Sequence, residues 1–283
     1  MMTRILRRLN DLRAETAQWR SEGQSVGVVP TMGALHEGHL SLVEAAKAQC
    51  DRIVVTIFVN PMQFNSPGDL TSYPRVEEED AGKLSPLGVD LIYAPTPEEV
   101  YPSGFATTIT VDGLTDMMEG PNRPGHFDGV ATVVAKLFLK TQADRAYFGE
   151  KDYQQLLVVR RMAADLNIPI EVVGCETVRE ASGLAMSSRN RRLSEAGMRQ
   201  AAALHQVMRE VAQALADGTR FAPLQADAVR RLEQAGFDPV EYLELRDVET
   251  LAPLDSVSTD ARLFAAAFIE GVRLIDNIAI PAR

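Results

Sequence analysis

Residues 25–60 read SVGVVPTMGALHEGHLSLVEAAKAQCDRIVVTIFVN, and they give the clearest indication of the fold class. It contains a short apolar run at 25–31, a helical pattern at 39–49 and a second apolar run at 51–60. Val and Ile occupy both faces of the two short runs, which is typical of parallel strands covered by helices on both sides. The order strand, helix, strand therefore predicts the beginning of a doubly wound α/β domain.

The same alternation of strand and helix continues downstream. Further strands of the parallel set are predicted at 89–96 (VDLIYAPT), 144–149 (DRAYFG) and 168–178 (IPIEVVGCETV). Apolar residues at helical spacing precede the last two strands: Val130, Val133, Val134, Leu137 and Phe138 in the first stripe, and Leu156, Val159, Ala163 and Leu166 in the second. We therefore expect a Rossmann-like sheet, whose ligands gather at the carboxyl ends of the strands.

A polar run at 181–194, ASGLAMSSRNRRLS, is followed by a different pattern. A long Ala-rich helix should end at Gly218 and a second helix near Gly236, before the strand-like runs VEYLELRDV and RLFAAAFIEGVRLIDNI. The apolar stripe of the long helix comprises Leu204, Val207, Met208, Val211 and Leu215. The chain is therefore expected to be an α/β protein, with a Rossmann-like doubly wound parallel sheet in a domain at 1–185 and a smaller α+β domain at 186–283.

The composition excludes several classes of function. A net charge of −10 and a pI near 5.0 argue against a nucleic-acid partner, because such proteins usually carry a basic face. The two cysteines, Cys50 and Cys175, give no basis for a disulfide framework or a zinc cluster. No stretch stays apolar for about 18 residues, and the N-terminus lacks the apolar run of a signal peptide. We therefore expect a cytoplasmic protein without membrane contact.

The most informative motif is PTMGALHEGH at 30–39, between the first strand and the first helix. Gly33 and Gly38 permit close approach of the backbone, and the start of the helix should present unpaired N–H groups. His36 and His39, three residues apart, can face the same side of the first helical turn. These donors, together with the positive end of the helix dipole, suit the oxygens of a triphosphate.

Two other interpretations of the histidine pair compete with phosphate binding. The histidines could simply cap the helix, and the motif alone leaves that interpretation open. A structural zinc site is disfavoured, since H-x-x-H lacks the i, i+4 spacing and the third ligand of familiar helical zinc sites. No cysteine lies near the motif in the sequence.

A second motif, FVNPMQFN at 58–65, ends the second strand. Asn60 and Gln63 are candidate ligand-binding residues, because neutral amides can orient a hydroxy acid without imposing a net charge. Met62 and Phe64 could form apolar walls of such a pocket. The alternative is an ordinary turn, which the Asn-Pro pair also favours.

A third motif, YFGEKDYQQ at 147–155, again joins a strand to a helix. Gly149 is expected to allow the turn, Lys151 to reach a phosphate, and Gln155 to face the same pocket. The alternative is a capped helix, with Asp152 near its N-terminus and Lys151 in solvent.

The fourth motif, MSSRNRR at 186–192, lies between the two expected domains. Its hydroxyl and guanidinium groups suit a mobile loop that closes over a triphosphate or a departing pyrophosphate. A plain basic linker is the alternative interpretation.

Taken together with YPR at 73–75 and RPGHFDGV at 123–130, these motifs make the chain resemble the pantothenate synthetase (pantoate–β-alanine ligase) family. This family belongs to the nucleotidyltransferase-like superfamily with an HxGH motif. The resemblance covers most of the chain and implies two half-reactions. Pantoate and MgATP would give pantoyl adenylate and pyrophosphate, and β-alanine would then attack the acyl carbon to give pantothenate and release AMP.

The resemblance also implies roles for individual residues. The ATP-binding residues would be Met32, Gly33, Ala34, Leu35, His36, Glu37, Gly38, His39, Gly149, Glu150, Lys151, Asp152, Val178, Met186, Ser187, Ser188 and Arg189. The catalytic residues among them would be His39 as the proton donor, His36, Lys151, Ser187, Ser188 and Arg189. Gln63, Gln155 and Asn60 would bind pantoate, and Gln63 also β-alanine. No direct Mg²⁺ ligand is implied, and Asp80 is a candidate indirect partner of the metal.

The resemblance further implies that 1–185 binds nucleotide and pantoate, that 186–283 carries the loop that closes over the ATP site, and that the protein is a homodimer. Ser182 stands where family members often have Asp, which points to altered tuning of the loop. Two rival functions remain. A different adenylyl-transferring enzyme would keep AMP in its product, and a regulatory or RNA-binding module would keep the fold without catalysis.

Overall fold

The computed structural model describes residues 3–65 and 67–282, and the chain divides into two compact units. The first unit runs to Glu176 and the second begins at Thr177. The boundary expected after residue 185 lies further along the chain, inside the second unit. The intervening segment belongs to that unit because its Arg179 is bonded to Asp276.

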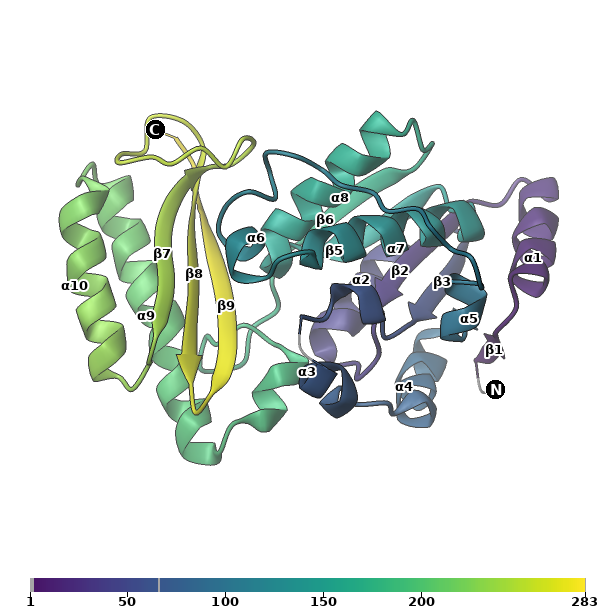
Figure 1. The fold of residues 1–283 in the computed structure, drawn as a ribbon, viewed down its shortest axis with the longest axis horizontal. Coiled ribbons are helices and arrows are strands. Elements are labelled where there is room, and N and C mark those ends of the chain that lie inside the picture. The colour runs from purple at the N-terminus through teal and green to yellow at the C-terminus, as the bar shows by residue number, and fades with distance from the viewer. Residues whose placement is uncertain (1–2, 66, 283) are drawn as a thin grey trace. The chain divides into compact units, whose positions relative to one another are not determined.

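The first unit contains a six-stranded sheet in the order β1-β4-β3-β2-β5-β6, and every pair in it is parallel (Figure 1). The strands are β1 (Arg4–Leu6), β2 (Val26–Thr31), β3 (Arg52–Ile57), β4 (Leu91–Tyr93), β5 (Arg145–Gly149) and β6 (Glu171–Cys175). The predicted Rossmann-like sheet is therefore confirmed. The short edge strand β1 was not predicted, because three residues carry too little pattern to detect.

Helices connect these strands. They are α1 (Leu9–Ser21), α2 (Glu37–Lys47), α3 (Pro67–Ser72), α4 (Glu77–Leu84), α5 (Pro97–Val100), α6 (Glu119–Asn122), α7 (His126–Thr141) and α8 (Tyr153–Asp165), with 3-10 turns η1 (Pro61–Gln63), η2 (Ser85–Leu87) and η3 (Glu150–Asp152). Leu166 was expected in the buried stripe of α8 but is 49% exposed, because the helix ends one residue earlier. None of the helices in the described ranges combines the length and apolar character needed to cross a bilayer.

Both faces of the parallel sheet are buried. Val29, Val55 and Ile92 occupy matching positions on neighbouring strands and pack with apolar residues of α2 and α4. Val28 and Val54, one residue earlier in the same register, are also buried and point to the opposite face, because side chains alternate along a strand. This is the reason why the strands read as continuous apolar runs in the sequence.

The second unit is a three-stranded antiparallel sheet, β7-β8-β9, with two helices packed against it (Figure 1). Its elements are η4 (Ser188–Arg192), α9 (Glu195–Ala216), α10 (Phe221–Gln234), β7 (Val240–Asp247), β8 (Ala261–Ile269) and β9 (Val272–Ile280). All five residues of the predicted α9 stripe are buried. Gly218 and Gly236 follow the two helices with positive φ angles of 94° and 101°, as C-terminal glycines do.

Candidate active site

The strand order of the first unit places two of the motifs beside each other. β2 pairs with β5 in parallel, and the order of strands along the chain reverses between them. In such sheets ligands bind outside the carboxyl ends of the strands at this reversal point. β2 ends at Thr31 and leads into the histidine motif, while β5 ends at Gly149 and leads into the lysine motif (Figure 1).

The backbone of the histidine motif has an unusual conformation before the helix begins. Gly33 has a φ angle of 83°, and the next residue, Ala34, also has a positive φ of 53°. A Cβ atom at Gly33 would lie 3.0 Å from Oδ2 of Asp80 and 3.1 Å from Ile57. Glycine is therefore required here both by the left-handed conformation and by the close packing of the loop.

Helix α4 holds this loop by its polar groups. The buried carboxylate of Asp80 accepts the backbone N–H groups of Ala34 and Leu35, each over 2.8 Å. Nζ of Lys83 donates to the carbonyl oxygen of Leu35, also over 2.8 Å. Burial raises the pKa of Asp80, although the two amide bonds act against that rise. Asp80 was expected only as an indirect partner of Mg²⁺, and its contact with the loop was not predicted.

The start of the helix was expected to present unpaired N–H groups, but several amides at this start and in the loop before it are bonded within the protein. Ala34 and Leu35 donate to Asp80, as described above. Gly33 donates to Oγ1 of Thr31 over 3.2 Å, and the N–H groups of His36 and Gly38 donate to the imidazole rings over 3.3 and 3.2 Å. These amides are satisfied within the protein.

The two histidines form a reciprocal cap at the start of α2. Nδ1 of His36 accepts from the N–H of Gly38, and Nδ1 of His39 accepts from the N–H of His36. The ring centroids lie 4.1 Å apart. The capping interpretation is therefore confirmed. The capping bonds use only the Nδ1 atoms, so capping and ligand binding are compatible. A neutral imidazole that accepts at Nδ1 carries its proton on Nε2, so Nε2–H is the donor group of such a ring.

The surroundings keep His39 neutral. Burial is the largest cause that lowers its pKa to about 3, followed by the charge interactions with His36, Lys151 and Lys83. At neutral pH, His39 is therefore a hydrogen-bond donor through Nε2–H and not a cation. Because the charge of Lys151 contributes to this lower pKa, the third motif acts electrostatically on the first. The side chain of Lys151 is only 16% exposed, with Nζ 3.8 Å from Oδ2 of Asp152.

Asn60 is used differently from the prediction that it binds pantoate. Its Nδ2 donates to Oε1 of Gln63 over 3.1 Å and to the carbonyl oxygen of Gly129 over 3.0 Å. Its Oδ1 accepts from the hydroxyl of Tyr101 over 2.7 Å and from the N–H of Met62 over 3.3 Å. An amide side chain has two donor hydrogens and two acceptor lone pairs, so these contacts use its full capacity. Asn60 is 1% exposed and orients Gln63.

Gln63 connects the first and second motifs. Its Nε2 donates to Sδ of Met32 over 3.1 Å. Its backbone carbonyl oxygen lies 2.8 Å from Nδ1 of His126. A Cβ atom at Gly129 would lie 2.4 Å from the carbonyl oxygen of Met62, so only glycine lets α7 pack this closely against the loop. Sequence reasoning did not assign roles to His126 and Gly129, although both lie in the RPGHFDGV segment that signalled the family.

The third motif contains two neighbouring glutamines in different surroundings. Gln154 is buried, and it donates to the carbonyl oxygens of Leu114 and Met117 over 2.7 and 2.9 Å. Gln155, the residue predicted to bind pantoate, is only partly buried. The structure thus separates a glutamine that supports the fold from one that solvent can reach.

Gly149 does not have the conformation expected of it. Its φ is −73° and its ψ is 134°, which any residue can adopt, so the prediction that glycine allows the turn is wrong. A Cβ atom at this position would meet nothing within 4 Å. The backbone beside Gly149 therefore borders open space, and close approach of a ligand is another reason for glycine at the end of a strand.

The fourth motif lies in the second unit and has a regular structure. The N–H of Met186 donates to the carbonyl oxygen of Val178 over 3.0 Å. Oγ of Ser187 accepts from the N–H of Arg189 over 3.2 Å and caps η4, so Ser188 and Arg189 begin a short 3-10 helix. Ser182 is exposed in the turn that precedes this segment.

The chain matches the family described as pantoate-beta-alanine ligase over residues 4–279. It belongs to the pantoate–β-alanine ligase family. Among curated relatives, the pantothenate synthetase of Ruegeria pomeroyi is 65% identical over 99% of this chain and 98% of its own length. The pantothenate synthetase of Paracoccus denitrificans is 55% identical, with 99% of each chain covered.

Solved structures of this ligase family also match the chain. The crystal structure of pantothenate synthetase from Thermus thermophilus has a TM-score of 0.90 and 46% identity, covering 99% of this chain and all of that one. The pantoate–β-alanine ligase of Francisella tularensis, complexed with β,γ-ATP and β-alanine, has a TM-score of 0.83 and 34% identity over 98% and 97% of the two chains. The predicted family, fold and ligase activity are confirmed.

Proposed function

We propose that this ligase condenses (R)-pantoate with β-alanine in two steps, at the expense of ATP, and that the histidine pair and Lys151 carry the first step. The observation behind this assignment is that the imidazoles of His36 and of the neutral His39 lie 4.1 Å apart at the strand reversal point of the sheet, where the charge of Lys151 acts on His39. Membership of the ligase family supplies the overall reaction. The residue roles below are our assignment.

In the first step a carboxylate oxygen of pantoate attacks the α-phosphorus of ATP. The bond from that phosphorus to the bridging oxygen breaks, and pyrophosphate leaves. His36 and His39 donate Nε2–H bonds to phosphate oxygens, while Lys151 supplies a positive charge. Because His39 is neutral, its contribution is a fixed hydrogen bond, and donors fixed in advance of the reaction stabilise the charge of a transition state efficiently.

Gln63 is the proposed anchor of pantoate. Its Nε2 has a second hydrogen and its Oε1 a second lone pair beyond the bonds to Met32 and Asn60, so it can bind a hydroxyl and a carboxylate group. Gln155 contributes from α8. Asn60 holds Gln63 in place and does not contact the substrate.

In the second step the free amine of β-alanine attacks the acyl carbon, AMP leaves, and the amine loses a proton to water. Gln63 also orients β-alanine.

The remaining ATP contacts come from the third and fourth motifs and from Val178. The backbone of Val178 meets the adenine ring, and Lys151 with the open backbone at Gly149 meets the phosphates. The Met186–Arg189 run, with Ser187 and Ser188, neutralises charge on the triphosphate as part of a closing loop. Mg²⁺ would enter the site bound to ATP and would neutralise part of the negative charge of the phosphates. The cation is expected to be held mainly by phosphate oxygens and water.

The cellular setting is proposed on the same family relationship. We place the enzyme in the cytoplasm, where ATP is available, as a homodimer. Gel filtration combined with light scattering tests the dimer, for which a mass near twice 31.0 kDa is expected.

The deciding experiment measures AMP, pyrophosphate and pantothenate, with MgATP and pantoate present and β-alanine present or absent. Pantothenate and AMP should accumulate only when all three substrates are supplied. A burst of pyrophosphate equal to the enzyme concentration should appear without β-alanine, because the adenylate stays bound. AMP retained in the product would favour another adenylyl transferase, and no consumption of ATP would favour a regulatory module.

A further inference from the structure

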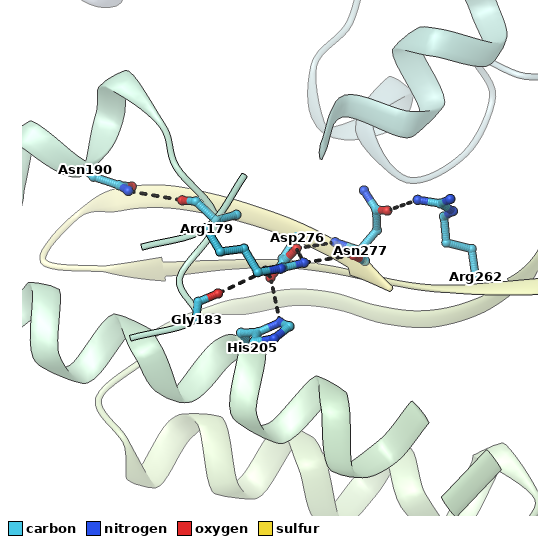
Figure 2. A network of polar contacts seen from close by, with 8 residues as sticks. Arg179, Gly183, Asn190, His205, Arg262, Asp276 and Asn277 are labelled. Atoms are coloured by element: carbon cyan, nitrogen blue, oxygen red, sulfur yellow. Dashed lines mark hydrogen bonds and ion pairs between the residues drawn. The ribbon is translucent and has the colours of Figure 1, made fainter. Parts of the chain in front are cut away.

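The second unit contains an ion pair that the proposed reaction does not use. Asp276 lies on β9, is 3% exposed, and accepts two hydrogen bonds from the guanidinium of Arg179. Nη1 of Arg179 lies 2.7 Å from Oδ2, and Nη2 lies 2.9 Å from Oδ1. Figure 2 shows the two side chains next to each other, joined by dashed lines. Such a bidentate pair fixes both distance and orientation, which a single hydrogen bond does not.

Other groups complete the surroundings of this pair (Figure 2). The carboxylate also accepts from the N–H of Asn277 over 2.7 Å, and Nδ1 of His205 on α9 lies 3.5 Å from Oδ2. Nη1 of Arg179 donates in addition to the carbonyl oxygen of Gly183 over 3.1 Å. Burial would raise the pKa of Asp276, but the contacts with His205 and Arg179 outweigh it and lower that pKa. The carboxylate is therefore charged, in spite of its burial.

Arg179 belongs to a tight hairpin. It forms an antiparallel bridge with Ala185, and the N–H of Glu180 donates to the carbonyl oxygen of Leu184 over 2.8 Å. The turn closes with a bond of 2.8 Å from the N–H of Gly183 to the carbonyl oxygen of Glu180. Nδ2 of Asn190 in η4 donates to the carbonyl oxygen of Ala185 over 3.1 Å. The hairpin is thus also bonded to η4.

The hairpin joins two parts of the proposed ATP site. The N–H of Met186 donates to the carbonyl oxygen of Val178 over 3.0 Å, so the residue proposed to meet adenine and the first residue of the Met186–Arg189 run are directly bonded. A displacement of the hairpin would therefore move both nucleotide contacts together. The hairpin is held to the sheet by the Arg179–Asp276 pair and by a bond of 3.4 Å from Arg179 to the carbonyl oxygen of Asn277. It is also held by Leu184, which is buried in the core of the unit, and by the close contact of Gly183 with His205 on α9, where a Cβ atom would lie 2.8 Å from the ring.

We propose that Asp276 is a positioning residue for ATP, which acts through Arg179 to fix the hairpin at residues 178–186. This inference rests on the proposed function only for the ATP contacts of Val178 and of the Met186–Arg189 run. Asp276 itself touches neither substrate nor reacting atoms. A pair that merely stabilised the second unit would affect unfolding but leave the affinity of the folded enzyme for ATP unchanged.

The test uses the full-length enzyme with Asp276→Asn and Arg179→Lys, each of nearly unchanged size. Asparagine removes the charge, and lysine keeps the charge but loses the two-pronged geometry. In the folded variants the KM for ATP should rise between about ten- and a hundredfold, since small displacements of binding groups have effects of this order. The KM for pantoate should change less than about threefold. ATP binding without pantoate, measured by calorimetry, should weaken in parallel.

Glu241→Gln is the matched control. Glu241 on β7 accepts a hydrogen bond of 2.7 Å from Nε of Arg273 on β9, so the control removes a partly buried carboxylate–arginine pair from the same sheet. This variant should keep the wild-type KM for ATP. The double variant Arg179→Lys/Asp276→Asn should be no worse than the more impaired single variant, because both act through one contact.

Hydrogen exchange provides a readout that does not depend on the reaction. The amides of Glu180 and Met186, which bond across the hairpin, should exchange faster in Asp276→Asn than in the wild type, while amides in β8 should not. Folded variants with wild-type KM for ATP and unchanged exchange would overturn the proposal. If Asp276→Asn does not fold, Arg179→Lys gives the same decision. A wild-type enzyme that consumed no ATP would instead contradict the proposed function, and the exchange result would still stand.

Discussion

The carboxylate of Asp80 accepts the backbone N–H of Leu35 over 2.8 Å, immediately before the first histidine of the motif. Its second oxygen accepts the N–H of Ala34 at the same distance. Both oxygens thus hold a loop whose conformation includes a left-handed non-glycine residue. A strained loop of this kind persists only when its surroundings determine it. The orientation of the histidines therefore depends on a residue of another helix.

The first prediction concerns Asp80→Asn. The new amide can accept only one of the two N–H groups and turns a donor towards the other, which should lower the free energy of unfolding by about 1–3 kcal/mol. Adenylation should also fall, since the histidines lose their support. The control is Glu78→Gln, which removes an exposed charge from the same helix. If Asp80 acted mainly through Mg²⁺, raising the Mg²⁺ concentration would restore the rate, and we expect no such recovery.

The second prediction concerns stability against pH. The pKa of His39 is about 3 in the folded protein and 6.5 in the reference state, so the unfolded chain binds more protons between these values. The contribution of His39 therefore destabilises the fold progressively as the pH falls from 6.5 towards 3, by at most about 1.4 kcal/mol per pH unit. Urea unfolding of wild type and His39→Gln at several pH values should show a flatter slope in the variant. Parallel slopes would contradict the assignment.

The third prediction separates chemistry from folding. His39→Ala and Lys151→Ala should unfold cooperatively, as the wild type does, but release pyrophosphate about a hundred- to a thousandfold more slowly, the range found when one stabilising donor is removed. Lys47→Ala serves as control, because Lys47 is the last residue of α2, whose first turn contains His39, and it bonds to the carbonyl oxygen of Leu87. A normal rate of pyrophosphate release in either active-site variant would defeat the assigned roles.

The fourth prediction concerns Gly129→Ala. The added Cβ would meet the carbonyl oxygen of Met62 at 2.4 Å and the backbone nitrogen of Gln63 at 2.7 Å, so the loop has to move. We expect a raised KM for pantoate together with a loss of stability of about 1–3 kcal/mol. Gly82→Ala is the control: its Cβ would meet nothing within 4 Å, and alanine should stabilise α4 slightly. An unchanged KM for pantoate in Gly129→Ala would argue against Gln63 as the anchor.

Much of this protein follows from its sequence alone. The apolar runs at 25–31 and 51–60 required a covered parallel sheet, because both faces of each run are apolar. The stripe that ends near Gly218 determined the long helix α9. The four polar motifs, in their order, identified the family. Each of these features depends on residues that are close along the chain, where spacing is sufficient evidence.

The contacts that hold these motifs could not be predicted from the sequence and became visible in the folded protein. Asp80 reaches Leu35, Asn60 reaches Gly129, and Asp276 reaches Arg179 across long separations in the sequence. No local pattern reveals which acceptor a distant amide or guanidinium will meet. The neutral state of His39 likewise results from burial and from charges brought near it by the fold. The sequence determined which groups are present, and the packing of distant segments determined their partners and their protonation, because hydrogen bonds and desolvation depend on distance in space.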